Sequence, residues 1–216
     1  MAKYHKYVFD FEKREFVGDF EKMYCNEVKE GFEPWVQADC MELSRKIVLS
    51  VLEGYNFDRI LDLGCGKGYF TQFFKKHNNF VRGVDVSATA VSRAKISFPK
   101  IDFMSGDVTN KEFFNEMSKE GKYDLVFSYG LLQYTQDYPV LLRNISKVTK
   151  YFLLYEPILD NPIGFVKSKS DLLDAVEGDY CIENNIFLDS IYEDVREHSI
   201  ILMLKSKCVL AELKDV

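Results

Sequence analysis

ILDLGCGKGYF, at residues 60–70, is the stretch that decides the fold of this chain. A short apolar run enters three alternating glycines, Gly64, Gly66 and Gly68, and an apolar pattern typical of a helix follows from Tyr69. Glycine adopts positive φ without strain and has no Cβ, so a ligand can lie directly on the peptide groups of such a turn. The sequence predicts a strand, a ligand-contacting turn, and a helix that directs its free N–H groups at the same point.

The spacing of the glycines separates two classes of nucleotide-binding turn. Dinucleotide-binding turns have the pattern G-x-G-x-x-G, whereas this turn is G-x-G-x-G and has Tyr69 at the last position of the dinucleotide pattern. Asp62, two residues before the first glycine, would repel a pyrophosphate and attract an ammonium group. The pattern from Asp62 to Gly68 resembles the first motif of the class I S-adenosylmethionine (SAM) methyltransferases. An NAD-linked oxidoreductase of similar topology is the alternative.

The resemblance implies two further acidic positions, and the sequence supplies both. Asp85 ends the second predicted strand, 21 residues after Gly64, where the family binds the ribose hydroxyls. Asp107 follows the third strand, where the family has an acidic residue near the adenine amino group; its alternative role is to cap the next helix. The cofactor contacts expected from the resemblance are Asp62, Gly64, Cys65, Gly66, Gly68, Asp85, Val86, Gly106, Asp107, Val108, Ser128, Tyr129 and Trp35.

The loop after the fourth predicted strand bears on the methyl acceptor. Many relatives that act on small molecules carry a Glu-His pair here, and this chain aligns Gln133 and Tyr134 with that pair. A tyrosine, whose pKa is ordinarily near 10, is a poor general base at pH 7. Tyr134 is therefore expected to orient the acceptor or to form an aromatic wall. The acceptor is expected to be nucleophilic already, as a phosphate or carboxylate oxygen or a neutral amine.

A hydroxyl acceptor would need a base from elsewhere in the chain. His5 on an N-terminal lid, Glu156 at the end of the fifth strand, and His198 on a distant hairpin are the candidates. The expected catalytic residues are Tyr134, Gln133, Glu156 and His5. Trp35 and Gln37 are candidates to close the pocket from the N-terminal side, although Trp35 also fits a role as a core anchor.

Alternation of strands and helices from residue 59 onward predicts an α/β fold. Strands are expected at 59–63, 81–85, 101–105, 123–128 and 151–156, the last stopped by Pro157, and helices at 70–76, 89–97, 111–118 and 140–148. The resemblance, which covers Arg59 to Glu156, implies a doubly wound, mostly parallel seven-stranded sheet with an antiparallel C-terminal strand, a Rossmann-like fold. Ligands bind at the carboxyl ends of such strands.

One methyltransferase domain, residues 1–216, is expected to have three parts. Residues 1–36 form an N-terminal lid with one or two short helices, and residues 37–156 form the SAM-binding core, with a helix over 38–52. Residues 157–216 contain a substrate loop over the pocket, a helix at 171–176, and a C-terminal hairpin of strands 186–192 and 200–204.

The composition of the chain argues against several classes of binding partner. A formal net charge of −6 argues against a nucleic-acid binder, and five cysteines without a C-x-x-C pair predict neither a disulfide framework nor a metal site. With no apolar run of about eighteen residues and no export signal, the expectation is a cytoplasmic monomer or homodimer that does not bind membranes.

The sequence leaves the acceptor open. The loop from Ser128 to Leu131 lacks the Asn/Asp-Pro-Pro-aromatic sequence of enzymes that methylate base or amide nitrogens. The resemblance to compact enzymes of sugar, nodulation-factor and surface-polysaccharide pathways implies O- or N-methylation of a small molecule, such as a nucleotide- or sugar-linked precursor. A non-catalytic SAM-fold regulatory subunit is a further alternative.

Overall fold

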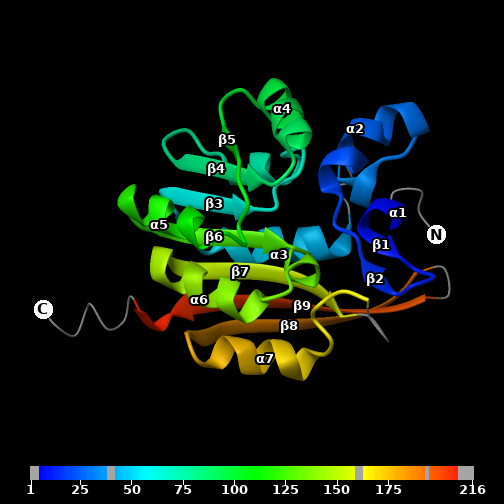
Figure 1. Cartoon of the computed structure of the whole chain (residues 1–216). Helices are drawn as coiled ribbons and strands as arrows, with labels where there is room; N and C mark the ends of the chain where they lie inside the picture. The colour runs from blue at the N-terminus through cyan, green and yellow to red at the C-terminus, as the bar shows by residue number, and fades with distance from the viewer. Residues whose placement is uncertain (1–4, 38–41, 159–162, 193–194, 209–216) are drawn as a thin grey trace, which may run out of the picture.

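A seven-stranded sheet forms the centre of the computed structural model, which describes residues 5–37, 42–158, 163–192 and 195–208 (Figure 1). Its strand order is β5-β4-β3-β6-β7-β9-β8, and β3 to β7 pair in parallel. β9 lies between β7 and β8 and is antiparallel to both, which confirms the predicted fold class. The strands are β3 (Arg59–Leu63), β4 (Phe80–Asp85), β5 (Asp102–Ser105), β6 (Tyr123–Tyr129), β7 (Thr149–Ile158), β8 (Tyr180–Tyr192) and β9 (Val195–Ser206).

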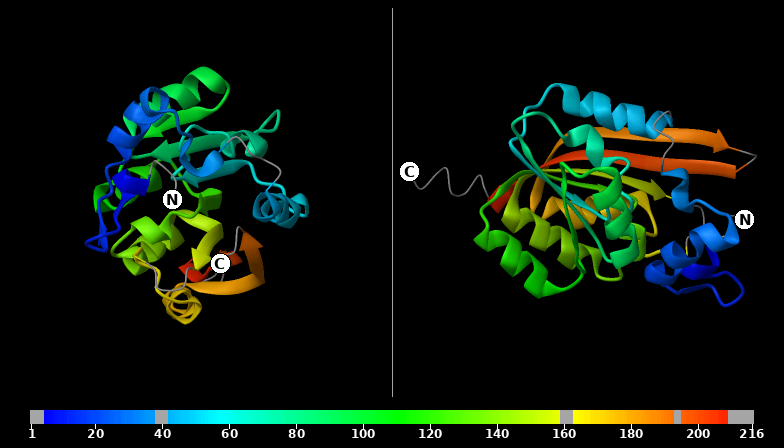
Figure 2. Two further views of the ribbon diagram at one scale, coloured as in Figure 1. Left: turned by 90° about the vertical axis from the view of Figure 1, so that its right-hand side faces the viewer. Right: turned by 90° about the horizontal axis from the view of Figure 1, so that it is seen from above.

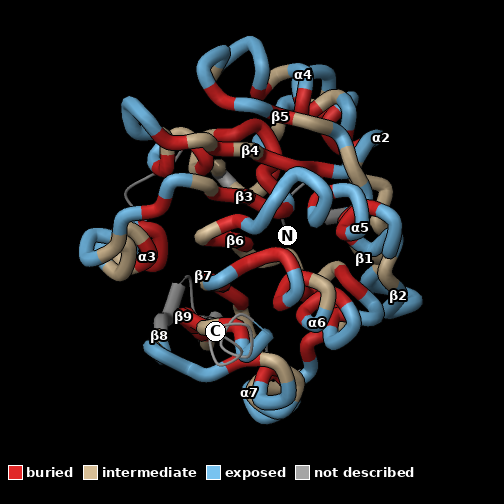
Figure 3. Tube along the Cα trace, turned by 90° about the vertical axis from the view of Figure 1, so that its left-hand side faces the viewer, coloured by how far each residue is buried: buried red, intermediate tan, exposed pale blue. Residues whose placement is uncertain are grey.

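Helices cover both faces of the sheet, and this explains the nearly continuous apolar runs of the central strands. One face packs against α5 (Lys111–Lys119), α6 (Tyr138–Val148) and α7 (Lys169–Glu177). The other face packs against α3 (Leu43–Glu53) and α4 (Ala88–Ser97). Figure 2 shows α3 on the opposite side of the sheet from α5 and α6. Figure 3 shows that the buried residues are concentrated in the strands and that the outer sides of the helices are exposed.

The prediction of a helix over residues 70–76 is wrong. This segment contains one short 3₁₀ turn, η2 (Thr71–Phe74). Phe70 and Phe74 both pack on the ring of Phe127, with centroids 5.1 and 4.9 Å away. The Asn79 side chain accepts from Lys76 N and donates to Phe74 O, so the chain turns back to β4 after a single turn. Tertiary contacts outweigh the local helical pattern here.

The strand expected to stop before Pro157 continues through Ile158. Tyr155 O accepts a hydrogen bond from Gly130 N, so the backbone groups of Tyr155 point toward β6. Every second residue of a strand points to the same side, so the backbone of Pro157 also points toward β6. Because β6 ends at Tyr129, the missing N–H of Pro157 removes no ladder bond. The substrate loop expected from Pro157 therefore begins later, and its residues 159–162 lie outside the described part of the chain.

The predicted C-terminal hairpin is confirmed and is longer than expected. β9 pairs with β7 as far as Ile158 and His198, and β8 and β9 continue past that point as a two-stranded ribbon. Figure 2 shows this ribbon extending toward the end of the sheet where the N-terminal segment lies. The hairpin is therefore close to the ligand-binding end of the sheet and is not distant from it.

The N-terminal residues form a small unit at the carboxyl ends of the parallel strands (Figure 1). It consists of α1 (His5–Val8), β1 (Phe9–Asp10), β2 (Glu15–Phe16), α2 (Phe20–Glu30) and the 3₁₀ turn η1 (Pro34–Val36). We refer to residues 5–37 as the lid. The helix predicted from residue 38 is observed from Leu43, and residues 38–41 lie outside the described part. Within the described residues, no helix is long and apolar enough to cross a membrane.

Candidate active site

The glycine turn has the predicted positive-φ geometry, but its three glycines serve different purposes. Their φ values are 76°, 54° and 78° at Gly64, Gly66 and Gly68. Gly64 faces the cavity described below. A Cβ on Gly66 would overlap the Gln37 amide of the lid, and one on Gly68 would lie 2.6 Å from the Phe103 ring. Gly66 and Gly68 therefore allow close packing of the lid and of β5, and neither is among the cavity-lining residues.

Asp85 ends β4 and holds the glycine turn. Its carboxylate accepts from Gly66 N at 2.8 Å and from Ser87 N at 2.9 Å. Burial raises the pKa of Asp85, and those two backbone N–H groups oppose the rise. Each carboxylate oxygen keeps a lone pair for a further donor, and the side chain lines the cavity. The residue therefore suits a ligand with paired hydroxyl groups.

Asp62 lies beneath the turn, 3% exposed, and accepts from the Thr71 hydroxyl at 2.6 Å. Burial is the main cause that raises its pKa to about 7, with a smaller contribution from the charge of Asp85. A cationic group in the cavity would lower this pKa again. The position would therefore suit an ammonium-bearing ligand.

Asp107 does not cap the helix that follows β5. Its Oδ1 accepts from the backbone N and the hydroxyl of Thr109 at 2.8 and 2.6 Å, while Asn110 caps α5 through Glu112 N. The alternative role considered for Asp107 is therefore wrong. Asp107 lines the cavity together with Gly106 and Val108.

A cavity of about 930 Å³ lies at the carboxyl ends of the parallel strands. Its proximal part, after β3, β4 and β5, is lined by Asp62, Gly64, Cys65, Asp85, Val86, Gly106, Asp107, Val108 and Thr109. Its distal part, near β6, β7, the start of α3 and the hairpin, is lined by Glu42, Leu43, Ser44, Arg45, Tyr129, Gly130, Leu131, Tyr155, Pro157, Leu188, Asp189 and Ser199. Such a volume is at the upper end of the range for small-molecule sites.

Lid aromatics close the cavity around Tyr134. Trp35 Nε1 donates to the Tyr134 hydroxyl at 3.1 Å, and Phe16 stacks on the Tyr134 ring with centroids 6.2 Å apart. Phe20 meets the same ring edge-on at 5.5 Å. Trp35, Phe16, Phe20 and Tyr134 all line the cavity. Tyr134 therefore forms part of an aromatic wall, and Trp35 combines the two roles considered for it.

Ion pairs attach the lid to the glycine turn. Lys67, between two of the turn glycines, lies 3.3 Å from Glu27 on α2 and 3.6 Å from Glu33. Glu27 also pairs with Arg93 on α4. The Gln37 side chain accepts from Lys67 N at 3.1 Å and donates to the Tyr24 hydroxyl at 2.9 Å. The lid and the predicted cofactor loop therefore form one connected unit.

Gln133 and Glu156, both expected near the reacting atoms, lie behind the cavity wall. Gln133 donates through Nε2 to Pro157 O and accepts through its backbone from Phe165 N at 2.9 Å. Glu156 is fully buried and accepts from Leu132 N at 2.7 Å. Burial raises the pKa of Glu156 to about 8. Neither side chain lines the cavity, so the geometry gives both a role in holding the loop that carries Tyr134.

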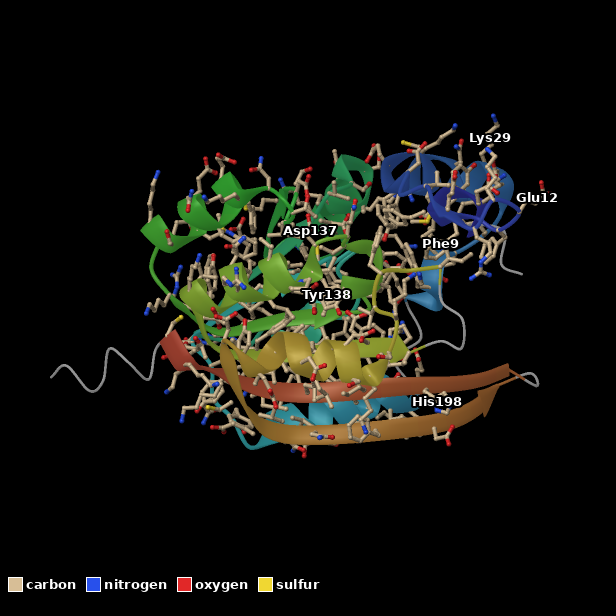
Figure 4. The ribbon with its side chains drawn as sticks, turned by 60° about the horizontal axis from the view of Figure 1, so that its bottom comes forward. Phe9, Glu12, Lys29, Asp137, Tyr138 and His198 are labelled. Atoms are coloured by element: carbon tan, nitrogen blue, oxygen red, sulfur yellow. The ribbon has the colours of Figure 1, made fainter. Side chains whose placement is uncertain are left out.

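Ser128, another of the predicted residues, is not among the residues that line the cavity. Ser128 is fully buried in β6, and its hydroxyl has no hydrogen-bond partner among the described residues. His5 begins α1, but its side chain lies outside the described part of the chain. His198, on the hairpin, has Nδ1 3.2 Å from Asp189 Oδ1. Figure 4 shows His198 on the hairpin and Phe9 on the lid, toward the same end of the molecule.

Sequence reasoning missed the polar cluster in the distal part. The Ser44 hydroxyl lies 2.6 Å from the Tyr129 hydroxyl, and both bond to Glu42 Oε1, at 2.8 and 3.2 Å. Arg45 Nε lies 3.3 Å from Glu42 Oε2. No motif marks Glu42, Ser44 or Arg45, which come from the start of α3, whereas Tyr129 at the end of β6 was expected as a cofactor contact. Asp189 and Ser199 were missed because the hairpin was expected to lie far from the site.

Comparison with known proteins gives the same family as the motifs. Residues 60–151 match the family model described as a methyltransferase domain. Malonyl-[acyl-carrier protein] O-methyltransferase of Hamiltonella defensa subsp. Acyrthosiphon pisum (strain 5AT) is 31% identical over 91 residues, which cover 42% of this chain and 33% of that protein. Ribosomal RNA small subunit methyltransferase C of Klebsiella pneumoniae is 28% identical over 144 residues, covering 59% and 41%. The match thus spans less than half the length of each of these curated relatives.

Solved structures show the same fold. N-methyltransferase NodS from Bradyrhizobium japonicum WM9, in complex with S-adenosyl-L-homocysteine (SAH), has a TM-score of 0.68 and 16% identity, covering 86% of this chain and 97% of that chain. The N-terminal domain of EvdMO1 with SAH bound has a TM-score of 0.59 and 14% identity, covering 80% and 82%. The chain therefore contains, at residues 60–151, a segment that matches a methyltransferase domain, and its fold is that of the SAH-bound methyltransferase NodS.

Proposed function

We propose that this protein transfers the methyl group of SAM to an oxygen or nitrogen atom of a small molecule. The observation that carries this proposal is the two-part cavity. Its proximal part presents the backbone of the glycine turn and the Asp85 carboxylate, and its distal part provides further space beside Tyr129 and Tyr155. A methyl donor and an acceptor therefore fit in one enclosed site.

The proximal residues fit SAM. Gly64 faces the cavity without a side chain, the two Asp85 oxygens would accept from the ribose hydroxyls, and the Asp62 carboxyl would pair with the ammonium group. Asp107 and Val108 would flank the adenine. We also propose Cys65, Val86 and Gly106 as wall contacts, and Ser128, Gly66 and Gly68 as residues that support the site from behind.

Alignment is the main catalytic task of this chain. SAM supplies an electrophilic methyl carbon that a lone pair attacks in line. The chain has to hold the two reactants together and exclude water. Tyr134, Trp35 and Phe16 close the cavity on the lid side, and the Gln133 and Glu156 contacts hold the loop that carries Tyr134. No residue of the described cavity wall supplies an imidazole base.

A small acceptor is supported over RNA, although the curated relatives include ribosomal RNA methyltransferases. The net charge of −6 is unfavourable for binding a polyanion, and the lid covers the cavity. We propose a nucleotide- or sugar-linked precursor of a surface polysaccharide as the acceptor. We further propose that the chain forms one domain, acts in the cytoplasm, and binds no membrane. The sequence-based alternatives, an NAD-linked oxidoreductase and a silent subunit, are outcomes of the tests below.

Transfer from SAM with a deuterated methyl group tests the proposed activity. The protein is incubated with the labelled donor, a cell extract of small metabolites, and separately with total RNA, and the products are analysed by mass spectrometry. We expect SAH formation and label in a small molecule, with loss of both in Asp85→Ala. Label in RNA alone would refute the small-molecule acceptor. Failure to form SAH with any acceptor would support a silent subunit.

A further inference from the structure

The distal part of the cavity offers little to an anionic acceptor. Among the described residues that line the cavity, Arg45 is the only lysine, arginine or histidine. Its side chain is 6% exposed, and its guanidinium contacts Glu42 at 3.3 Å, Gln37 O at 3.3 Å and Trp35 O at 3.2 Å. The positive charge of Arg45 is therefore already paired and covered. A phosphate or carboxylate entering this space would lose water without gaining a cationic partner.

Two carboxylates make the distal part more favourable for a cationic ligand than for an anionic one. The side chains of Glu42 and Asp189 line it and are 46% and 61% exposed. Ser44 and Tyr129 fix the orientation of Glu42 by donating to its Oε1. The pKa of the Tyr129 phenol is raised, chiefly by burial, so this group stays neutral and keeps donating. Arg45 offsets one of these two negative charges through Glu42 Oε2, so the described lining of the distal part keeps one carboxylate more than it has cationic side chains. A cationic ligand would meet the oriented, half-exposed Glu42 carboxylate.

Aromatic rings complete the environment. Tyr129 and Tyr155 stack with centroids 4.0 Å apart and an interplanar angle of 15°. Trp35 and Tyr134 face the cavity from the lid side. The Arg45 guanidinium already lies 5.5 Å from the Tyr129 centroid, so this ring system attracts a cation within the protein itself. Aromatic faces and a carboxylate together are the groups that bind alkylammonium ions.

We propose that the distal part of the cavity binds the acceptor as an amine, with Glu42 and the aromatic walls as its recognition elements, so that the methyl group goes to nitrogen. This inference rests on the proposed methyltransferase function. The bound ammonium releases one proton to water, and the nitrogen lone pair then attacks the methyl carbon. The carbon–sulfur bond breaks, its electron pair stays on sulfur, and the methylated ammonium loses its extra proton to solvent. The step needs no oxidant and no residue base.

Isosteric probes test the recognition directly. Trp35 is the only tryptophan of the chain and lines the cavity, so its fluorescence reports binding. The SAH-saturated protein is titrated with choline, with its uncharged isostere 3,3-dimethylbutan-1-ol, and with 3,3-dimethylbutanoate. We expect choline to bind at least ten times more tightly than the alcohol, and the carboxylate to bind more weakly than both.

Glu42→Gln tests whether Glu42 is responsible for the preference for choline over the alcohol. Glu116→Gln, a substitution at an exposed position of α5, is the matched control. We expect Glu42→Gln to reduce the choline preference at least fivefold while leaving the affinity of the alcohol unchanged, which also shows that the variant is folded. Glu116→Gln should behave as the parent protein. Equal binding of choline and the alcohol, or tighter binding of the carboxylate, would overturn the inference.

The test separates this inference from the proposed function. A protein that binds SAH and transfers labelled methyl groups to carboxylate or phosphate oxygens is a methyltransferase with a different acceptor, and only the amine assignment fails. A protein that does not bind SAH refutes the function itself.

Discussion

At the residue scale, the carboxyls carry most of the information in this site. Asp62, Asp85 and Asp107 follow from the motif spacing, and the structure places all three on the cavity wall. Glu156 also follows from its strand-end position, but its contacts give it a different role. It accepts from the backbone of the loop that carries Tyr134 and has no exposure to the cavity. A sequence pattern locates a carboxyl near a site, but it does not give the direction of the side chain.

Glu156 makes stability depend on pH. Its folded pKa, about 8, lies above the value near 4.5 expected in the unfolded chain, so between these values only the folded state holds the proton. The free energy of unfolding should therefore fall as pH rises from about 5 to about 8, by up to about 1.4 kcal/mol per pH unit for a full proton. Asp62, with a raised pKa of about 7, acts in the same direction.

Glu156→Gln tests this assignment, because the amide keeps an acceptor for Leu132 N and removes the titration. Urea unfolding between pH 5 and 8.5 should show a flatter pH dependence for the variant than for the parent protein. Asp124→Asn, on the same sheet but with its carboxylate bonded to the exposed Asp58–Arg59 backbone, is the control that should keep the parent slope. An unchanged slope in Glu156→Gln would show that this carboxyl is ionised in the fold.

At the element scale, the strands were predictable and the connections were not. Buried parallel strands are short apolar runs between turn residues, and the five predicted ones lie within two residues of their observed ends. The segment after the glycine turn failed because Phe70 and Phe74 pack on Phe127, a contact that no local pattern contains. The hairpin was found as a pair of strands, but its position at the cavity depends on the pairing of β9 with the end of β7, where Pro157 lies opposite Ser199.

The contact between the lid and the glycine turn should contribute to stability through Glu27. Its side chain is 8% exposed and pairs with Lys67 and Arg93. Glu27→Gln should lower the free energy of unfolding by about 1–3 kcal/mol, since the carboxylate of Glu33, 3.6 Å from Lys67 and more exposed, replaces the Glu27 ion pair only in part. Hydrogen exchange should also become faster in α2. Lys6→Gln, which breaks the exposed Lys6–Glu30 pair, should lower the free energy of unfolding by less than Glu27→Gln does. Equal effects of the two variants would contradict a buried attachment.

At the scale of the whole molecule, the lid, the carboxyl ends of the strands and the C-terminal hairpin lie toward one end (Figure 2), and residues from all three line one cavity. The class I fold, its cofactor and the proximal half of the cavity follow from the sequence, because they depend on glycine and carboxylate spacing within one continuous segment. The distal half combines the start of α3, the end of β7 and the hairpin. Its residues come from three separate segments, the first and last of them more than 100 positions apart, so only the folded chain brings Glu42, Tyr155 and Asp189 together.

Isothermal titration calorimetry with SAM and with SAH is the most direct test of the central claim, that the proximal cavity binds this cofactor through Asp85. We expect one site per chain for each ligand, and Asp85→Ala should weaken SAH binding at least 100-fold, about 2.7 kcal/mol. Asp102→Ala, which removes an exposed carboxylate of the neighbouring strand, should bind as the parent protein does. The absence of binding heat for both ligands, or undiminished affinity in Asp85→Ala, would contradict the account.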